Sequence, residues 1–151
     1  MLAEGCTPVR AAPGAVRAAI LDAATLARII PGAESVVRAP DGAFTAILGL
    51  GVGPFRGRQT VRIRVDEARA NTLLVSGHAD GPFGAGRATG GIDLLPTAQG
   101  GTVIAWHYEG EVHGPVALAG SVILRLSAAA FTAGVFRALG RSLGARCPPA
   151  K

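Results

Sequence analysis

Few side chains in this 151-residue sequence could bind a metal or act as a nucleophile. The three histidines, His78, His107 and His113, lack the spacing of metal ligands on a helix. Alternation also places His107 and His113 on the solvent-facing side of one strand. The serines of the C-terminal segment have no histidine or aspartate close to them in the sequence. The sequence therefore predicts neither a metal site nor a serine nucleophile.

The ten acidic residues are scattered, and they come close together only at Asp66–Glu67 and at Glu109 and Glu111. Asp66–Glu67 ends a predicted strand at a turn, whereas Glu109 and Glu111 can pair with arginines across a sheet. The glycine clusters at 49–53 and 84–86 lie in or beside strands, but a phosphate-binding loop opens a helix. We predict no catalytic residues, no metal and no defined cofactor, and hence a protein that is not an enzyme.

Arginine supplies almost all of the positive charge, because fourteen arginines and one lysine give a net charge of +5. Four of them, Arg56, Arg58, Arg62 and Arg64, fall on one face of a single predicted strand, since alternate side chains share a face. Two interpretations stay open: a solvated outer face, or a docking surface for anionic lipid or an acidic partner. No aromatic residue lies between these arginines, so nucleic-acid binding is not expected.

The composition and the chain ends point to a cytoplasmic protein. The first ten residues lack the basic start and apolar core of a secretory signal. The longest apolar stretch, Val116 to Phe136, contains Arg125 near its middle, so we expect a helix within the protein and not a membrane span. Cys6 and Cys147 lie near opposite ends, where a disulfide is an alternative that the sequence leaves open.

The chain length supports one domain over residues 1–151, with an α+β architecture. Turn signals at short intervals favour antiparallel strands, predicted near 44–50, 56–65, 71–79, 86–96 and 102–112. Helices are predicted at 15–21, from an Asp22 cap through Arg28, and from Val116 to about Leu143. The expected order is one strand, two short helices, about six antiparallel strands and one long helix.

One face of this sheet is expected to be apolar and to face the long helix, leaving space because bulky side chains are scarce. Ordinary core packing is the alternative interpretation of the same residues. Gln59 and Tyr108 could supply hydrogen bonds. The candidate ligand-binding residues are Phe44, Leu48, Phe55, Gln59, Val61, Ile63, Phe83, Ile92, Trp106, Tyr108, Leu126 and Phe136.

Several segments resemble the family of the carbon monoxide dehydrogenase G subunit, within the START-like helix-grip superfamily. The resemblance covers nearly the whole chain, and its motifs are not catalytic signatures. They are Ile30-Pro31-Gly32-Ala33-Glu34-Ser35, Val52-Gly53-Pro54-Phe55-Arg56-Gly57, Ser76-Gly77-His78-Ala79-Asp80-Gly81, Gly100-Gly101-Thr102 and Val112-His113-Gly114-Pro115.

The resemblance implies a helix-grip fold, in which a curved antiparallel sheet of about seven strands wraps around a long C-terminal helix. It also implies an accessory role beside a molybdenum hydroxylase of the carbon monoxide dehydrogenase type, at the cytoplasmic face of the membrane. The expected ligand is a hydrophobic small molecule such as a quinone or a lipid. Two alternatives remain: an enzyme of the START-like cyclase or dehydratase type, and an assembly factor without a cavity.

Overall fold

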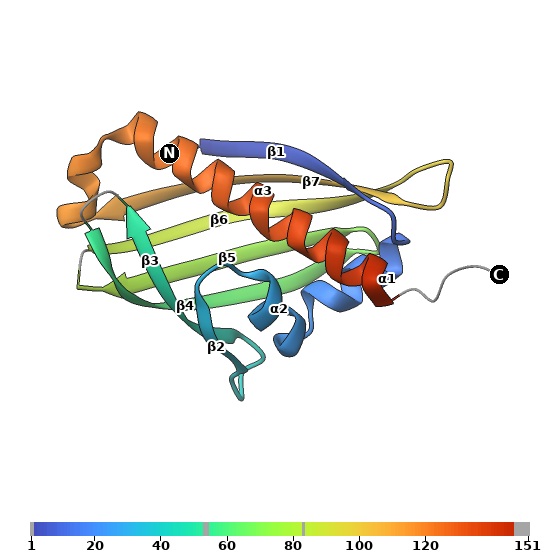
Figure 1. Ribbon diagram of the computed structural model, residues 1–151, viewed down its shortest axis with the longest axis horizontal. Helices are drawn as coiled ribbons and strands as arrows, with labels where there is room; N and C mark the ends of the chain where they lie inside the picture. The colour runs from blue at the N-terminus through green and yellow to red at the C-terminus, as the bar shows by residue number, and fades with distance from the viewer. Residues whose placement is uncertain (1, 53–54, 83, 147–151) are drawn as a thin grey trace.

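The structure, a computed structural model, describes residues 2–52, 55–82 and 84–146; the side chains of residues 50–52, 55–56, 119, 121–123 and 144–146 lie outside that description. A curved sheet forms one layer, and the helices lie across one of its faces (Figure 1). The elements are, in order, β1 (Leu2–Val9), α1 (Pro13–Ile20), α2 (Ala23–Ile29), β2 (Ala33–Arg38), β3 (Phe44–Val52), β4 (Phe55–Arg69), β5 (Thr72–Gly81), β6 (Gly84–Pro96), β7 (Thr102–His113), the 3-10 helix η1 (Pro115–Ala119) and α3 (Ser121–Arg146).

The sheet has seven antiparallel strands in the order β1-β7-β6-β5-β4-β3-β2. Strands β2 to β7 follow one another as neighbours, whereas β1 pairs with β7 at the far edge, with Leu2 opposite Glu109. The segment that holds α1 and α2 must therefore cross the width of the sheet between β1 and β2. The expected order of elements is confirmed, although the sequence patterns did not locate β2.

Alternation along the strands separates an inner from an outer face. In β7, Ile104 and Trp106 are buried, while His107 and Glu109 are exposed. In β4, Val61, Ile63 and Val65 pack partly against the core, and the arginines between them are exposed. Because side chains alternate in a strand, one face of the sheet is apolar and faces the helices.

The two short helices begin where the sequence indicates. Pro13 opens α1, where its missing N–H costs no hydrogen bond. The Asp22 carboxylate caps α2, accepting hydrogen bonds from the Thr25 backbone N–H at 3.1 Å and from the Thr25 hydroxyl at 2.6 Å. The faces of these helices that turn toward the sheet are buried, including Val16, Ile20 and Ile29. Both helices thus cover the inner face, α1 against β6 and α2 against β2.

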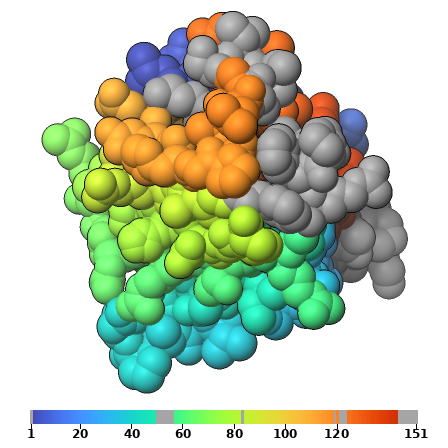
Figure 2. Space-filling view, turned by 90° about the vertical axis from the view of Figure 1, so that its left-hand side faces the viewer, coloured from blue at the N-terminus to red at the C-terminus, as the bar shows by residue number. Residues whose placement is uncertain are grey.

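The long C-terminal helix starts later than predicted. Pro115 begins a 3-10 turn, and Gly120 adopts φ 94°, a conformation that an α-helix does not contain, so α3 begins only at Ser121. Leu118 lies in the 3-10 turn and is 85% exposed. Figure 2 shows this segment, in orange, against the yellow-green region where β5 and β6 meet.

The face that α3 buries also differs from the prediction in part. Phe136 and Leu139 are buried, as the 3.6-residue repeat requires of an inward face. Leu126, predicted on that same face, is 62% exposed. The helix lies along β1 and above α1 and α2, so it crosses the sheet without lying flat on its central strands (Figure 1).

Candidate functional site

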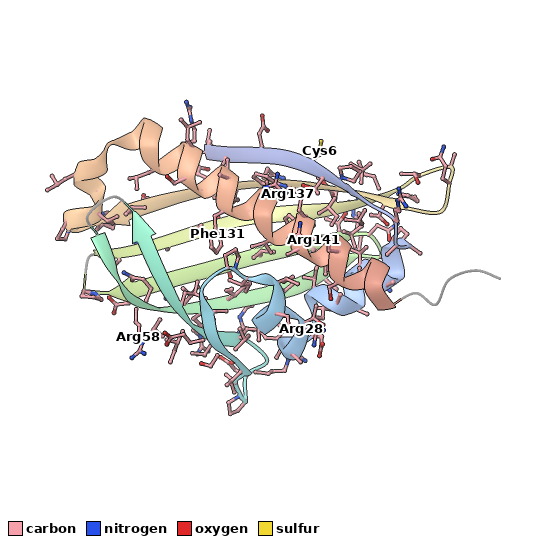
Figure 3. The ribbon with its side chains drawn as sticks, viewed as in Figure 1. Cys6, Arg28, Arg58, Phe131, Arg137 and Arg141 are labelled. Atoms are coloured by element: carbon pink, nitrogen blue, oxygen red, sulfur yellow. The ribbon has the colours of Figure 1, made fainter. Side chains whose placement is uncertain are left out.

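A cavity of about 290 Å³ lies between the inner face of the sheet and the helices. Strands β4 to β7 form its floor, and α1, α2 and α3 form its walls. Figure 3 shows Phe131 reaching from α3 over the sheet. The lining residues are Ile20, Leu26, Ile29, Ile63, Val65, Val75, Gly77, Ala88, Thr89, Gly90, Gly91, Ile92, Trp106, His107, Tyr108, Phe131, Thr132, Val135 and Phe136.

The space exists because small residues occupy a row across the floor. Gly77 and Ala88 are register partners on β5 and β6 and line the cavity, so no side chain larger than a methyl group rises there. The next row contains Gly90 opposite Tyr108, and a Cβ atom at Gly90 would come within 2.6 Å of the Tyr108 Cβ. The floor is therefore low in its middle. A side chain at position 90 would fit only if β7 moved.

An aromatic cluster closes one side of the cavity. The Trp106 and Tyr108 rings are stacked with centroids 6.0 Å apart, and Phe136 of α3 lies 6.5 Å from the indole. The indole covers Gly5 of β1, where a Cβ atom would lie 2.5 Å from the Trp106 Cζ2. Gly5 is thus the position that lets the tryptophan lie flat across the edge strand.

Two polar groups border this apolar space. The Tyr108 hydroxyl lies 3.1 Å from the Thr132 hydroxyl, which itself donates to the Ala128 carbonyl at 2.9 Å. Because Thr132 has one hydroxyl proton and directs it to Ala128, Tyr108 is the donor to Thr132. The second group is Trp106 Nε1, a buried donor that has no hydrogen-bond partner among the described residues.

Burial raises the pKa of the Tyr108 hydroxyl above its usual value. The hydrogen bond with Thr132 lowers the pKa and offsets part of that rise, because the Thr132 hydroxyl can turn to donate to a phenolate. The phenol therefore stays protonated near neutral pH, and its proton is directed at Thr132. A group in this state is suited to packing and to hydrogen bonding, not to proton abstraction.

A second hollow of about 850 Å³ adjoins the cavity and shares Thr89, Gly90, His107 and Tyr108 with it. It lies beside the start of β1 and the first half of α3, where Leu2 and Leu126 are exposed. Leu126 therefore borders this outer hollow and not the inner cavity. An apolar chain that leaves the cavity past Tyr108 would reach solvent here.

The predicted arginine row lies on the outer face of β4. The Arg58 Nε lies 2.9 Å from a Glu34 carboxylate oxygen, and Asp41 pairs with both Arg62 and Arg64. Figure 3 shows Arg58 pointing away from the molecule. The side chain of Arg56 lies outside the described residues. Carboxylates from β2 and the β2–β3 turn thus balance part of this positive charge.

The profile of one protein family, described as the G subunit of carbon monoxide dehydrogenase (CoxG), matches residues 5–144. The chain belongs to this family. No curated protein matches the sequence.

Solved structures place this CoxG family member in the START-like helix-grip fold. A conserved protein from Geobacillus kaustophilus is 22% identical, with a TM-score of 0.89 and coverage of 96% of both chains. A START superfamily protein from Mycobacterium smegmatis is 12% identical, with a TM-score of 0.73 and coverage of 97% of this chain and 99% of that one. A protein from Thermus thermophilus is 16% identical, with a TM-score of 0.69 and coverage of 97% and 100%.

Five of the twelve candidate ligand-binding residues border the cavity of this CoxG chain: Ile63, Ile92, Trp106, Tyr108 and Phe136. Phe44 and Leu48 are buried in the core beside it, and Val61 packs partly against that core. Gln59 lies against Gly81, away from the lining. The Phe55 side chain and Phe83 lie outside the described residues, as does Cys147, so no pairing with the exposed Cys6 is described.

Sequence patterns missed the contribution of the short helices and three of the four α3 residues that line the cavity. Ile20, Leu26 and Ile29 reach the cavity from α1 and α2, and Phe131 and Val135 reach it from α3. The helical period could have suggested Phe131 and Val135, which are four residues apart. Which face of an alanine-rich helix turns inward is decided by its neighbours, and those belong to tertiary structure.

The described part of this CoxG chain contains no metal-binding cluster, no membrane-spanning helix and no nucleophile elbow. No group of three or more histidine, cysteine, aspartate or glutamate residues there could hold a metal ion. None of the described helices is long and apolar enough to cross a membrane. Ser142 is the centre of a Gly140-Arg141-Ser142-Leu143-Gly144 sequence, but it lies within α3, whereas a nucleophile elbow needs a turn between a strand and a helix.

Proposed function

We propose that this protein is a non-enzymatic accessory protein of a carbon monoxide dehydrogenase-type molybdenum hydroxylase, and that it carries a hydrophobic small molecule, such as a quinone or a lipid, in the cavity under α3. In this role it serves membrane recruitment of the enzyme or delivery of its electron acceptor, at the cytoplasmic face of the membrane. Family membership and the helix-grip fold support a ligand-binding accessory role in general.

The proposal rests on one observation, an apolar cavity that small residues on its floor keep open. Its volume of about 290 Å³ is close to the lower end of the ~300–1,000 Å³ found for small-molecule sites. An unfilled apolar space costs stability, since surrounding atoms lose packing partners. Gly77 and Ala88, which are register partners on two adjacent strands, nevertheless keep the floor low. A ligand that fills the space restores that packing.

The ionisable groups support a carrier better than an enzyme. Tyr108 borders the cavity, but its raised pKa and its bond to Thr132 keep its proton in place. His107 is exposed, and its ring lies beside Gly91 on the outer face of the sheet. A cyclase or dehydratase needs a group that can take up or release a proton at the substrate, and neither residue is placed to do so.

The outer face of β4 is the proposed docking surface for the enzyme or for anionic lipid. Arg58, Arg62 and Arg64 are exposed there, and each is paired with a carboxylate of the same chain. Such exposed pairs are weak and exchange partners readily, so an acidic surface can compete for the guanidinium groups. Binding through these arginines should weaken as salt is added.

Native purification followed by mass spectrometry of an organic extract tests the carrier role. Ala88 and Ala85 both lie on β6, with Ala88 on the cavity floor and Ala85 exposed on the opposite face. Ala88→Phe should therefore displace the ligand, whereas Ala85→Phe should leave it bound. The expected result is one hydrophobic molecule in stoichiometric amount in the native protein and in Ala85→Phe, and its loss in Ala88→Phe.

The same preparations test the accessory role. Subunits of the molybdenum hydroxylase should purify with the native protein at low salt and be lost when Arg58, Arg62 and Arg64 are changed to glutamine. Circular dichroism of each variant verifies that the fold is retained. An empty native protein, together with the absence of any hydroxylase subunit, would contradict the proposal.

A further inference from the structure

Strands β4 to β7 carry opposite charges at the two sides of their outer face. The described helices lie on the other face of the sheet (Figure 1). Arg62 and Arg64 are exposed on β4 and form an arginine column. Glu109 and Glu111 are exposed on β7 and form a glutamate column. Strand register places Arg62 in one row with Glu111, and the next row joins the other two residues. Each row therefore begins with a cation and ends with an anion.

The outer face is hollow between the arginine column and the glutamate column. The hollow has a volume of about 560 Å³, and all four column residues line it. In the row of Arg64, only Ser76 and Thr89 lie between the two columns, and both have short side chains. The charged ends of the columns are thus open to a surface that approaches from outside.

Contacts within the chain hold these charges only weakly. Asp41 pairs with both Arg62 and Arg64. The Arg87 Nε lies 4.0 Å from a Glu111 carboxylate oxygen. All of these side chains are between 43% and 75% exposed. Exposed ion pairs contribute little free energy, so the charged groups remain available to a second surface.

The spacing of the two columns selects the kind of partner. Strands β4 and β7 are three strand spacings apart, which is about 14 Å, because neighbouring strands lie about 4.8 Å apart. A small zwitterion cannot bridge that distance. An acidic surface matches β4 alone, whereas the whole face matches a surface with the same two columns in the reverse order. A second copy of this chain presents such a surface.

A two-fold rotation brings the columns of two copies together. The axis runs parallel to the strands, between β5 and β6, and the two outer faces meet. This rotation places β4 of one copy over β7 of the other and keeps the order of the rows. Arg62 then lies over Glu111 of the partner subunit, and Arg64 lies over Glu109 of the partner subunit. Because of the symmetry, each of these contacts occurs twice.

The residues between the columns are compatible with the same arrangement. Leu74, which is 52% exposed, lies on β5 in register with Gly91 of β6. The rotation therefore places this leucine over a position without a side chain in the other copy. The rotation also brings His78 over Arg87 of the partner subunit, without opposition of charge while the imidazole is neutral.

We propose that the outer face of β4 to β7 is a self-association surface, through which two copies form a weak dimer with two-fold symmetry. Such a dimer requires a patch that is complementary to itself, and the two columns provide one. Two curved sheets meet only over their middle, so the interface belongs to the small, transient class, below about 1,200 Å² in total. The inference goes beyond the proposed carrier function and does not depend on it, since the inner cavity stays free. An acidic partner or anionic lipid competes with the dimer for the arginine column.

Sedimentation velocity of the purified protein tests the dimer. At low salt the sedimentation coefficient should rise with protein concentration up to the millimolar range, and at high salt it should return to the value of the monomer. The assay contains neither hydrophobic ligand nor hydroxylase, so its failure is distinct from failure of the carrier function. A monomer at every concentration would overturn the proposal. Binding of that monomer to anionic vesicles through the arginine column would assign the face to lipid.

Two charge-reversal variants test the arrangement of the columns. Arg62→Glu with Arg64→Glu places glutamates in both columns, and Glu109→Arg with Glu111→Arg places arginines in both. Each variant alone should associate about 10- to 100-fold more weakly than the native protein, since four ion pairs become repulsive. An equimolar mixture should associate again, because each column then faces its opposite. A mixture that remains monomeric would overturn the two-fold arrangement.

A matched control separates this face from net charge. Arg137 and Arg141 are exposed on α3, on the side of the molecule that carries the helices (Figure 3). Arg137→Glu with Arg141→Glu changes the net charge as much as the β4 variant does, and it should leave association unchanged. Circular dichroism verifies the fold of each variant. Equal weakening by the control would show that association follows net charge, and it would contradict the proposed surface.

Discussion

The two faces of the central sheet are formed by alternate residues of the same strands. They differ in the size and charge of the side chains that they carry. On the outer face, Arg62, His78, Arg87 and Glu111 are register partners across four strands. On the inner face, the adjacent row runs from Ile63 across Gly77 and Ala88 to Gly110. The outer row is crowded with charge, and the inner row is nearly empty of side chains.

Because of this difference, the outer face interacts mainly with water, whereas the inner face is the candidate ligand-binding surface. The outer charges lie in water and pair with one another, so each pair contributes little free energy and can be replaced. The inner face holds unfilled space that lowers stability, together with a donor that has no partner among the described residues. Proteins tolerate such defects mainly where function requires them. The inner face is therefore where substitutions should have large and specific effects.

The sharpest test of this contrast uses two neighbouring leucines on β5. Leu73 is fully buried on the inner face, whereas Leu74 is 52% exposed on the outer face. Leu73→Ala should lower the free energy of unfolding by about 2–5 kcal/mol, since it removes a buried side chain and leaves a hole. Leu74→Ala should change it by less than about 0.5 kcal/mol. Urea unfolding followed by circular dichroism measures both, and equal losses would refute the contrast.

A smaller effect of opposite sign is expected when the inner row is filled. Ala88→Leu places three further carbon atoms in the cavity and should raise the free energy of unfolding of the ligand-free protein by about 0.5–2 kcal/mol. Ala85→Leu, on the exposed face of the same strand, is the control and should have almost no effect. If Ala88→Leu is destabilising, the cavity is already closed by packing in solution.

Alkaline pH should lower the free energy of unfolding, because it ionises Tyr108 on the inner face. The folded protein holds the Tyr108 proton more tightly than the unfolded chain does, because burial raises its pKa. Stability should therefore be unaffected below the ordinary tyrosine pKa of about 10 and should fall as pH rises above it. The chain has one tyrosine, so phenolate absorbance reports its titration directly. In Tyr108→Phe the fall should disappear; if it persists unchanged, another group is responsible.

The weakest effect is expected on the outer face. Asp41 pairs with Arg62 and Arg64, and all three side chains are about half exposed. Asp41→Asn keeps the oxygen that accepts from the Ala43 N–H, so it should cost no more than about 1 kcal/mol, and less at high salt. Asp66→Asn is the exposed control. A salt-independent loss at Asp41 would mean that its role is structural and not electrostatic.

Local sequence patterns predicted the elements that depend on residues close together in the sequence. Alternation located β4 and β7, and Asp22 marked the start of α2 because an aspartate at that position can cap the helix. The start of α3 was predicted too early, because the apolar residues after Pro115 continue a helical pattern that the backbone of Gly120 interrupts. Hydropathy carries no information on that backbone conformation.

The site was predicted only in part, for a different reason. Trp106, Tyr108 and Ile92 follow from strand alternation, which fixes the face of each residue. Leu126 was assigned to the wrong face, since alanine-rich helices carry apolar residues on every side. Closure of the cavity by α1 and α2 depends on contacts between distant segments, and no local pattern encodes them.

The pairing of β1 with β7 has a consequence for how the protein acquires its fold. Strand β1 cannot pair with β7 until residues 102–109 have been made, since Leu2 lies opposite Glu109 and Val9 opposite Thr102. Contacts so distant in sequence slow folding. The edge of β7 stays unpaired until β1 returns to it, and an open edge can recruit a strand from another chain. Loss of the first nine residues should therefore lead to aggregation or strand exchange before it affects any other property.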